Sequence, residues 1–112
     1  MSNLRRLGAE AEDRAADYLL GLGYTLVTRR FTVREGELDL VAMDGETLVF
    51  VEVKHRRGKA HPEEAMNPLK AGRLLAAAER YLEKSGLSDR PFRFDLIAIE
   101  NEQLRHHVDV SR

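Results

Sequence analysis

The chain has 112 residues, of which 43% are hydrophobic and 33% charged, and its formal net charge is −1. This length suits one domain over residues 1–112 with a single core, and no apolar run approaches the roughly 20 residues that a membrane-spanning helix needs. The absence of cysteine excludes disulfides and thiolate chemistry and suits a cytoplasmic protein, while the nearly neutral charge means that nucleic-acid binding requires a local basic surface.

The first half of the chain predicts one helix and three strands. Apolar residues recur at three- and four-residue intervals over residues 4–22, which indicates an amphipathic helix. A strand is predicted over 24–32. Two more strands follow near 37–43 and 48–54, and the Asp44-Gly45 dipeptide between them is a strong hairpin signal.

The second half predicts one helix and two strands. Asn67-Pro68 offers an N-cap followed by proline at the first helical position, so a helix should run from there to about Lys84. A start at Pro62 is the alternative. Two last strands are predicted over 93–99 and 104–110. The order of elements indicates the α/β class, with a mixed sheet flanked by helices.

The predicted hairpin carries charged residues where a core is expected. Residues 48–51 are apolar on both faces, as in a strand that is covered on both sides. If the loop has an even number of residues, Asp39, Glu52 and Lys54 lie on one side of the sheet. An odd number would separate them, because a one-residue shift of register reverses the face.

Two even loops remain open. A two-residue turn at Asp44-Gly45 pairs Asp39 with Phe50 and Glu37 with Glu52. A four-residue loop pairs Asp39 with Glu52 instead. Both loops keep the charged side chains on the same face, so both predict a cluster.

Such a cluster of carboxylates needs compensation. Two carboxylates about 5 Å apart repel by roughly 3 kcal/mol at an effective dielectric constant near 20, and burial adds a desolvation cost. Lys54 can offset one charge, but a divalent cation offsets more. Mg²⁺ (or Mn²⁺) prefers hard oxygen ligands together with waters and phosphate oxygens. An amine beside the metal can orient a water or neutralise charge on a phosphate, which is the chemistry of phosphodiester hydrolysis.

An aspartate in a strand, a hairpin, and Glu-x-Lys in the next strand resemble the PD-(D/E)xK nuclease superfamily. Here these residues are Asp39 and Glu52-Val53-Lys54. The order of the predicted elements also matches the αβββαβ restriction-endonuclease-like core of that superfamily.

The chain more closely resembles the YraN family of bacterial proteins, which are relatives of archaeal Holliday-junction resolvases. The resemblance covers nearly the whole chain and is carried by LGAEAEDRAADYL, GELDLVA, FVEVKHR and RFDLIAI. The chain departs from the family at Ala11, where glycine is usual, and at Arg30, where asparagine is frequent. The resemblance implies a Mg²⁺-dependent endonuclease acting on DNA, on branched or damaged structures, and a homodimer by analogy with resolvases.

A third carboxylate is expected from the first helix. At about 100° per residue, Glu12 lies at the edge of the apolar stripe, whereas Glu10 and Asp13 point away from it. The family pattern Glu-x-x-Ala-x-x-Tyr-Leu matches the chain at Glu12. The resemblance therefore implies that Glu12 joins Asp39 and Glu52 at the metal. The alternative is a solvated glutamate at the helix edge.

Three other groups are weighed as site residues. Glu37 is expected to belong to the turn or to support a ligand rather than to bind metal. Asp95 alternates within a buried strand and is expected to be structural. His106 and His107 are adjacent in a predicted strand, so they should point to opposite faces and share no metal.

Nucleic-acid contacts are expected from two basic segments. Arg56, Arg57 and Lys59 follow the candidate site directly and favour phosphate contact. Lys70 and Arg73 lie with Arg80 and Lys84 on one side of the second helix, for which a solvated surface is the alternative.

Three functional readings follow from these residues. The favoured one is a DNA endonuclease in which Asp39, Glu52 and Glu12 bind metal and Lys54 assists hydrolysis. The second is a non-catalytic nucleic-acid-binding module that retains the nuclease fold. The third is a structural domain in which the charged cluster is an ion-pair network.

Overall fold

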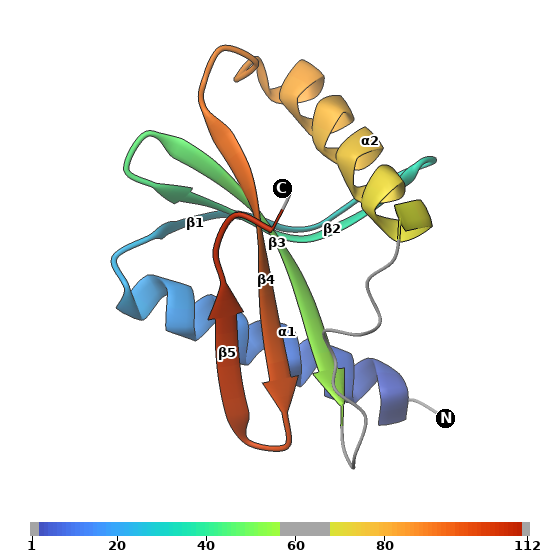
Figure 1. Ribbon diagram of the computed structural model, residues 1–112, viewed down its shortest axis with the longest axis vertical. Coiled ribbons are helices and arrows are strands. Elements are labelled where there is room, and N and C mark those ends of the chain that lie inside the picture. Colours follow the sequence, from blue (N-terminus) through green and yellow to red (C-terminus); the bar gives the residue numbers. More distant parts are fainter. Residues whose placement is uncertain (1–2, 57–67, 111–112) are drawn as a thin grey trace.

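A five-stranded mixed sheet, in the order β1-β2-β3-β4-β5, runs through the molecule with one helix on each face (Figure 1). The computed structural model describes residues 3–56 and 68–110. Its elements are α1 (Asn3–Gly21), β1 (Thr25–Val33), β2 (Gly36–Asp44), β3 (Thr47–Arg56), α2 (Pro68–Ser85), β4 (Phe92–Glu100) and β5 (Gln103–His107). The predicted α/β class is confirmed. No helix in the described residues is long and apolar enough to cross a bilayer.

The connections explain why the sheet is mixed. Short turns join β1 to β2, β2 to β3 and β4 to β5, and each of these pairs is antiparallel. The pair formed by β3 and β4 is parallel, and α2 lies between them in the chain. Parallel neighbours require such a crossover, because a hairpin can only reverse the direction of the chain.

The predicted central strand is covered on both faces. Val49 and Val51 pack with α1, whereas Leu48 and Phe50 pack with α2, and all four residues are buried. This is the pattern expected of a strand that is apolar on both sides.

Helix α1 buries its small residues against the sheet. From residue 9 onward, where its side chains are described, its buried hydrophobic residues are Ala11, Ala15, Ala16 and Leu19. The helix was predicted to extend to Leu22, but Leu22 follows its end and is 51% exposed. Small side chains on the buried face allow α1 to lie close to the sheet, which brings Glu12 close to the strands.

Helix α2 approaches the opposite face closely at Gly36. A Cβ atom on Gly36 would lie 2.9 Å from the backbone oxygen of Arg73, which is too close for any side chain. Deeper along the helix, Ala77, Ala78 and Tyr81 are buried. Leu75 is 46% exposed, because α2 leaves part of β4 uncovered and Leu75 lies over that part.

The hairpin between β2 and β3 decides the register of the charged residues. Asp44 pairs with Thr47, so the loop is Gly45-Glu46, one position later than predicted. Gly45 has a φ of +62°, which glycine adopts at little cost. The ladder continues to the pair of Leu40 and Val51, so extending it by one step places Asp39 opposite Glu52. This is the register of the four-residue alternative.

The last strand is shorter than predicted. It ends at His107 rather than at Val110. Asp109 has a φ of +57°, and its backbone N–H donates to Oδ1 of Asp95 at 3.0 Å. This turn removes the final residues from the ladder with β4, although the Val110 N–H still donates to the Phe94 carbonyl at 2.7 Å.

Candidate active site

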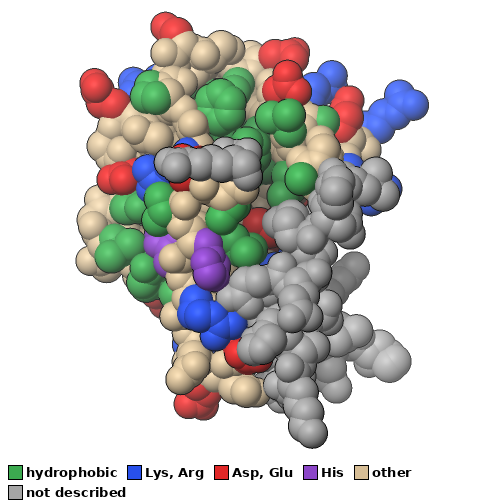
Figure 2. Space-filling view, viewed as in Figure 1, with side chains coloured by type: hydrophobic (Ala, Val, Ile, Leu, Met, Phe, Trp, Pro, Cys, Tyr) green, Lys and Arg blue, Asp and Glu red, His purple; other side chains and the backbone are tan. Residues whose placement is uncertain are grey.

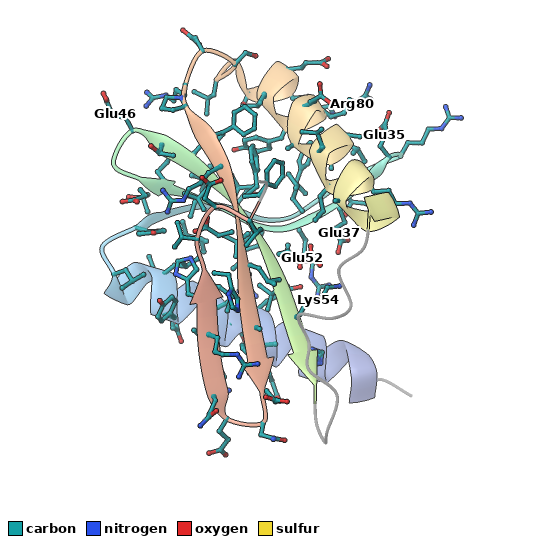
Figure 3. All side chains as sticks on the ribbon, viewed as in Figure 1. Glu35, Glu37, Glu46, Glu52, Lys54 and Arg80 are labelled. Carbon is teal, nitrogen blue, oxygen red and sulfur yellow. The ribbon has the colours of Figure 1, made fainter. Side chains whose placement is uncertain are left out.

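The charged residues of the hairpin meet where β2 and β3 separate. The pairing of β2 with β3 ends at Leu40 and Val51, and the next amide on this side, that of Val53, donates to Oδ2 of Asp39 at 2.8 Å. A side-chain carboxylate therefore takes the place of a strand carbonyl. In Figure 3, Glu37, Glu52 and Lys54 lie together below the start of α2.

The Asp39 carboxyl is electrostatically unfavourable as an anion. Burial raises the pKa of Asp39 to about 8, with further contributions from the negative charges of Glu52, Glu12 and Glu37. The hydrogen bond from Val53 acts in the opposite direction but does not outweigh them. Asp39 therefore holds a proton at neutral pH unless a cation replaces it.

Glu52 shares this environment. Burial raises its pKa, whereas Lys54 and a hydrogen bond with the neighbouring Asp39 carboxyl lower it. The two carboxyls form one pair, and the pKa of each lies above its ordinary value. Perturbed carboxyl pairs of this kind are characteristic of functional sites.

Lys54 forms an ion pair with Glu52. Its Nζ lies 3.1 Å from Oε1 of Glu52, and both side chains are largely buried, at 18% and 9% exposure. The spacing follows from the strand period, since residues two apart lie on the same face. The sequence prediction that Glu52 and Lys54 act together is consistent with this contact.

Glu12 lies on the other side of the site and contacts two arginines. Its Oε1 accepts a hydrogen bond from Nε of Arg30 at 3.1 Å and lies 3.8 Å from Nη2 of Arg29. Glu12 is only 10% exposed, whereas Asp13 is 61% exposed and pairs with Arg29 at 2.8 Å. The predicted ranking of these carboxylates by exposure agrees with the structure.

The donor geometry favours two carboxylates over three. Within residues 3–56 and 68–110, no group of three or more His, Cys, Asp or Glu side chains is arranged to hold a metal ion. The pair of Asp39 and Glu52 remains the donor set. That Glu12 adds a third metal oxygen stays a prediction.

Glu37 lies within β2 rather than in a turn. Its Oε2 accepts a hydrogen bond from the Thr32 hydroxyl at 2.9 Å across the β1–β2 hairpin. The charge of Glu37 contributes to the raised pKa values of both Asp39 and Glu52. It therefore adds to the negative potential of the site from its rim.

The basic segments are described only in part. Arg57 and Lys59 lie outside the described residues, as do the side chains of Arg56 and Lys70. Arg73 is exposed on the turn of α2 that packs over Gly36. The phosphate contacts expected from these residues stay predictions.

A second buried carboxylate, Asp95, has a full set of partners. It accepts hydrogen bonds from Nε of Arg93 at 3.0 Å and from the Asp109 amide at 3.0 Å, and it lies 2.7 Å from Nε2 of His106. Nδ1 of His106 is 3.1 Å from the Tyr18 hydroxyl. Sequence reasoning assigned Asp95 to the structure but did not connect it to His106. The two-residue spacing of Arg93 and Asp95 could have predicted the contact between these two residues, since it places both side chains on one face of β4.

An apolar groove lies apart from these carboxylates. It has a volume of about 290 Å³ between α2 and β4 and is lined by hydrophobic residues and Gly72, including Leu75, Phe94 and Val110. Figure 2 shows hydrophobic side chains gathered on this face. Among the residues that the structure describes, no ionisable side chain lines the groove.

Comparison with known proteins places the chain among related bacterial sequences. The family model described as uncharacterised protein family UPF0102 matches residues 11–99. A UPF0102 protein of Symbiobacterium thermophilum is 44% identical over 98 residues, which cover 86% of this chain and 83% of the relative. One from Dehalococcoides mccartyi is 40% identical over 98% of this chain and 93% of its own length. One from Geobacter sulfurreducens is 48% identical over 83% of this chain and 74% of its own length.

Proposed function

The chain belongs to the uncharacterised protein family UPF0102, and we propose that it is a Mg²⁺-dependent endonuclease that hydrolyses phosphodiester bonds of DNA, on branched or damaged structures. One observation carries the proposal: the half-buried Asp39 and the buried Glu52 form a carboxyl pair at the point where two strands separate, and Lys54 contacts Glu52. The similarity of Asp39 and Glu52-Val53-Lys54 to the PD-(D/E)xK motif supports the same chemistry.

The donor set fits a divalent cation. Both groups are hard oxygen ligands, and Mg²⁺ usually takes one or two carboxylates with waters and phosphate oxygens completing its shell. Their raised pKa values show that burial and neighbouring carboxylates disfavour the anions, an effect that a bound cation would offset. A bound Mg²⁺ would polarise the phosphate and make a coordinated water a better nucleophile.

The side chains of the chain itself divide the remaining work. Asp39 is held in place by the Val53 amide and Glu52 by Lys54, so the two oxygen donors keep a fixed separation. The Lys54 ammonium can orient the attacking water and stabilise the charge that develops on the phosphate. Pre-orientation of these donors is the main contribution that a protein makes to phosphoryl chemistry.

The decisive experiment incubates the protein with linear, nicked and four-way DNA in the presence of Mg²⁺ or Mn²⁺. We expect cleavage by the wild-type protein and none by Asp39→Asn, which removes a ligand charge and preserves side-chain size. Isothermal titration with Mn²⁺ should show that Asp39→Asn loses metal binding while keeping its circular dichroism spectrum.

Other outcomes would favour the rival functions. DNA binding without cleavage of any substrate would favour the nucleic-acid-binding module. Absence of metal binding and of DNA binding together would favour the ion-pair network of a structural domain.

A further inference from the structure

Arg30 has a backbone conformation that strands avoid. It lies in the middle of β1 with a φ of +54°. This left-handed region is costly for a residue with a Cβ atom and is populated mainly by glycine and asparagine. Strained residues of this kind concentrate at functional sites, because the surrounding contacts must hold them in place.

At this strained position, the side chains of β1 and β2 change the face of the sheet to which they point. Arg29 pairs with Leu40 and Phe31 pairs with Leu38, and the ladder skips the position between them. Leu40 belongs to the core on the α1 side, whereas Leu38, two residues away, belongs to the core on the α2 side. Residues two apart in a regular strand share a face, so both strands switch face at Arg30 and Asp39.

The switch directs two consecutive arginines to the same carboxylate. Nε of Arg30 donates to Oε1 of Glu12 at 3.1 Å, and Nη2 of Arg29 lies 3.8 Å from the same oxygen. In an alternating strand, adjacent side chains would point to opposite faces. The Arg30 guanidinium is thereby held at Glu12, and its hydrogen bond with Glu12 together with the charges of Glu12, Glu37 and Asp39 raises the pKa of Arg30.

The guanidinium of Arg30 keeps its outer donors available. Nε is used by Glu12, while the Nη groups form no hydrogen bond with any residue that the structure describes. The side chain is 50% exposed, whereas the Glu12 that fixes it is 10% exposed. An arginine that is oriented through Nε and open at both Nη groups has the fork geometry that binds phosphate oxygens.

We propose that Arg30 is a phosphate contact next to the candidate active site, oriented by Glu12, and that its Nη groups bind a non-bridging oxygen of a nucleic-acid phosphodiester. This inference rests on the proposed nuclease function and names a binding residue for its substrate. It gives Glu12 the role of a positioning residue that acts through Arg30 instead of binding the metal.

The test measures DNA binding without catalysis. Fluorescence anisotropy in EDTA, with a labelled duplex and a four-way junction, gives the affinity at several salt concentrations. Arg30→Asn is the informative variant, because asparagine tolerates a positive φ and the fold should survive. We expect about an eightfold weaker affinity at 0.1 M salt and a decrease of about one in the slope of log affinity against log salt.

The matched control is Arg90→Asn. Arg90 is exposed in the loop between α2 and β4, away from the site, and the substitution changes the net charge equally. We expect it to leave the affinity and the salt slope unchanged. Equal effects of the two substitutions would overturn the phosphate contact and reduce the role of Arg30 to that of a general surface charge.

Glu12→Ala tests the orienting role. The loss caused by Arg30→Asn should shrink in the Glu12→Ala background, because an arginine without its carboxylate is no longer held in place. An undiminished loss in that background overturns the role of Glu12 in orienting Arg30. Isothermal titration with Mn²⁺ adds a second readout: Glu12→Ala should retain metal binding, and a loss equal to that of Asp39→Asn would make Glu12 a metal ligand instead.

The two proposals fail in different ways. If the wild-type protein binds neither the duplex nor the four-way junction, the nuclease function and the Arg30 contact are both overturned. If the wild-type protein binds and cleaves DNA while Arg30→Asn behaves like Arg90→Asn, only the Arg30 contact is overturned.

Discussion

Asp39 and Asp95 are both aspartates in the interior of one sheet, yet their surroundings are opposite. Asp95 has Arg93, His106 and a backbone amide around it, and these hydrogen bonds lower its pKa even though burial acts to raise it. Asp39 has one amide, and its carboxylate neighbours add to the effect of burial. The number of donors, and not burial alone, decides whether an interior carboxylate is stable as an anion.

This difference separates structure from function within the sheet. The partners of Asp95 join β4, β5 and the turn after β5 into one network. Asp39 instead accepts from one amide of β3, has the Glu52 carboxyl as its neighbour, and lies where β2 and β3 part. The protein therefore tolerates an unfavourable carboxyl pair at one place because other regions supply the stability.

The largest expected effect comes from removing the satisfied carboxylate. Asp95→Ala leaves Arg93 and His106 without their shared partner and should lower the free energy of unfolding by about 3–5 kcal/mol. Urea denaturation measures it. Asp89→Ala, at an exposed loop position, is the control and should stay within about 0.5 kcal/mol of the wild-type protein. If Asp95→Ala changed the free energy of unfolding as little as Asp89→Ala does, the contrast drawn between Asp95 and Asp39 would be contradicted.

The two aspartates should also make stability depend on pH in opposite directions. The folded pKa of Asp39 is about 8 against an ordinary value of 3.8, so its contribution is full below 3.8 and is lost as the pH rises through 8. The pKa of Asp95 is lowered, so its contribution is present above 3.8 and is lost as the pH falls through the folded value.

Asp39→Asn isolates the first of these dependences. Between pH 5 and 9 in EDTA, the wild-type protein should lose on the order of 1–3 kcal/mol of its free energy of unfolding. This loss is smaller than the shift of the Asp39 pKa alone would give, because Asp39 and Glu52 share the proton. The variant should lack this fall and be the more stable protein at pH 9. Thermal unfolding across this range provides the measurement, and parallel curves for the two proteins would argue against a raised pKa.

Gly36→Ala tests how the Asp39 region depends on α2. The new methyl group would meet the Arg73 backbone at 2.9 Å, so the helix must shift, at a cost of about 1–3 kcal/mol. Gly72→Ala is the matched control, because nothing lies within 4 Å of its added Cβ and alanine favours helix. It should raise the melting temperature. If Gly36→Ala also raised the melting temperature, the close approach of α2 to Gly36 would not be needed for stability.

The smallest effect on stability is expected from Lys54→Ala. Glu52 loses its ion pair but can take up a proton, so the change should stay well below the about 3–5 kcal/mol expected where a buried charge is left uncompensated. Mn²⁺ affinity should be retained or increased, because a competing positive charge is removed, whereas DNA cleavage should be lost. Full cleavage by this variant would reduce Lys54 to an electrostatic partner of Glu52.

Local pattern determined most of the fold. The apolar periods predicted every helix and strand that the structure describes, with boundary errors of one to three residues. The run from Leu48 to Val51 predicted a strand that is covered on both faces. The two-residue spacing of Glu52 and Lys54 predicted their contact, because the strand period is a local property of the backbone.

Tertiary structure decided the rest of the site. The loop at Gly45-Glu46 set Asp39 opposite Glu52, a choice that the sequence left open between two registers. The positive φ of Arg30 and the change of face at Asp39 left no trace in the apolar pattern, since periodicity describes regular strands only. Which aspartate is paired with cations depends on residues far apart in the chain, such as His106 beside Asp95. Such long-range contacts follow from the packing of strands and helices, and no local period encodes them.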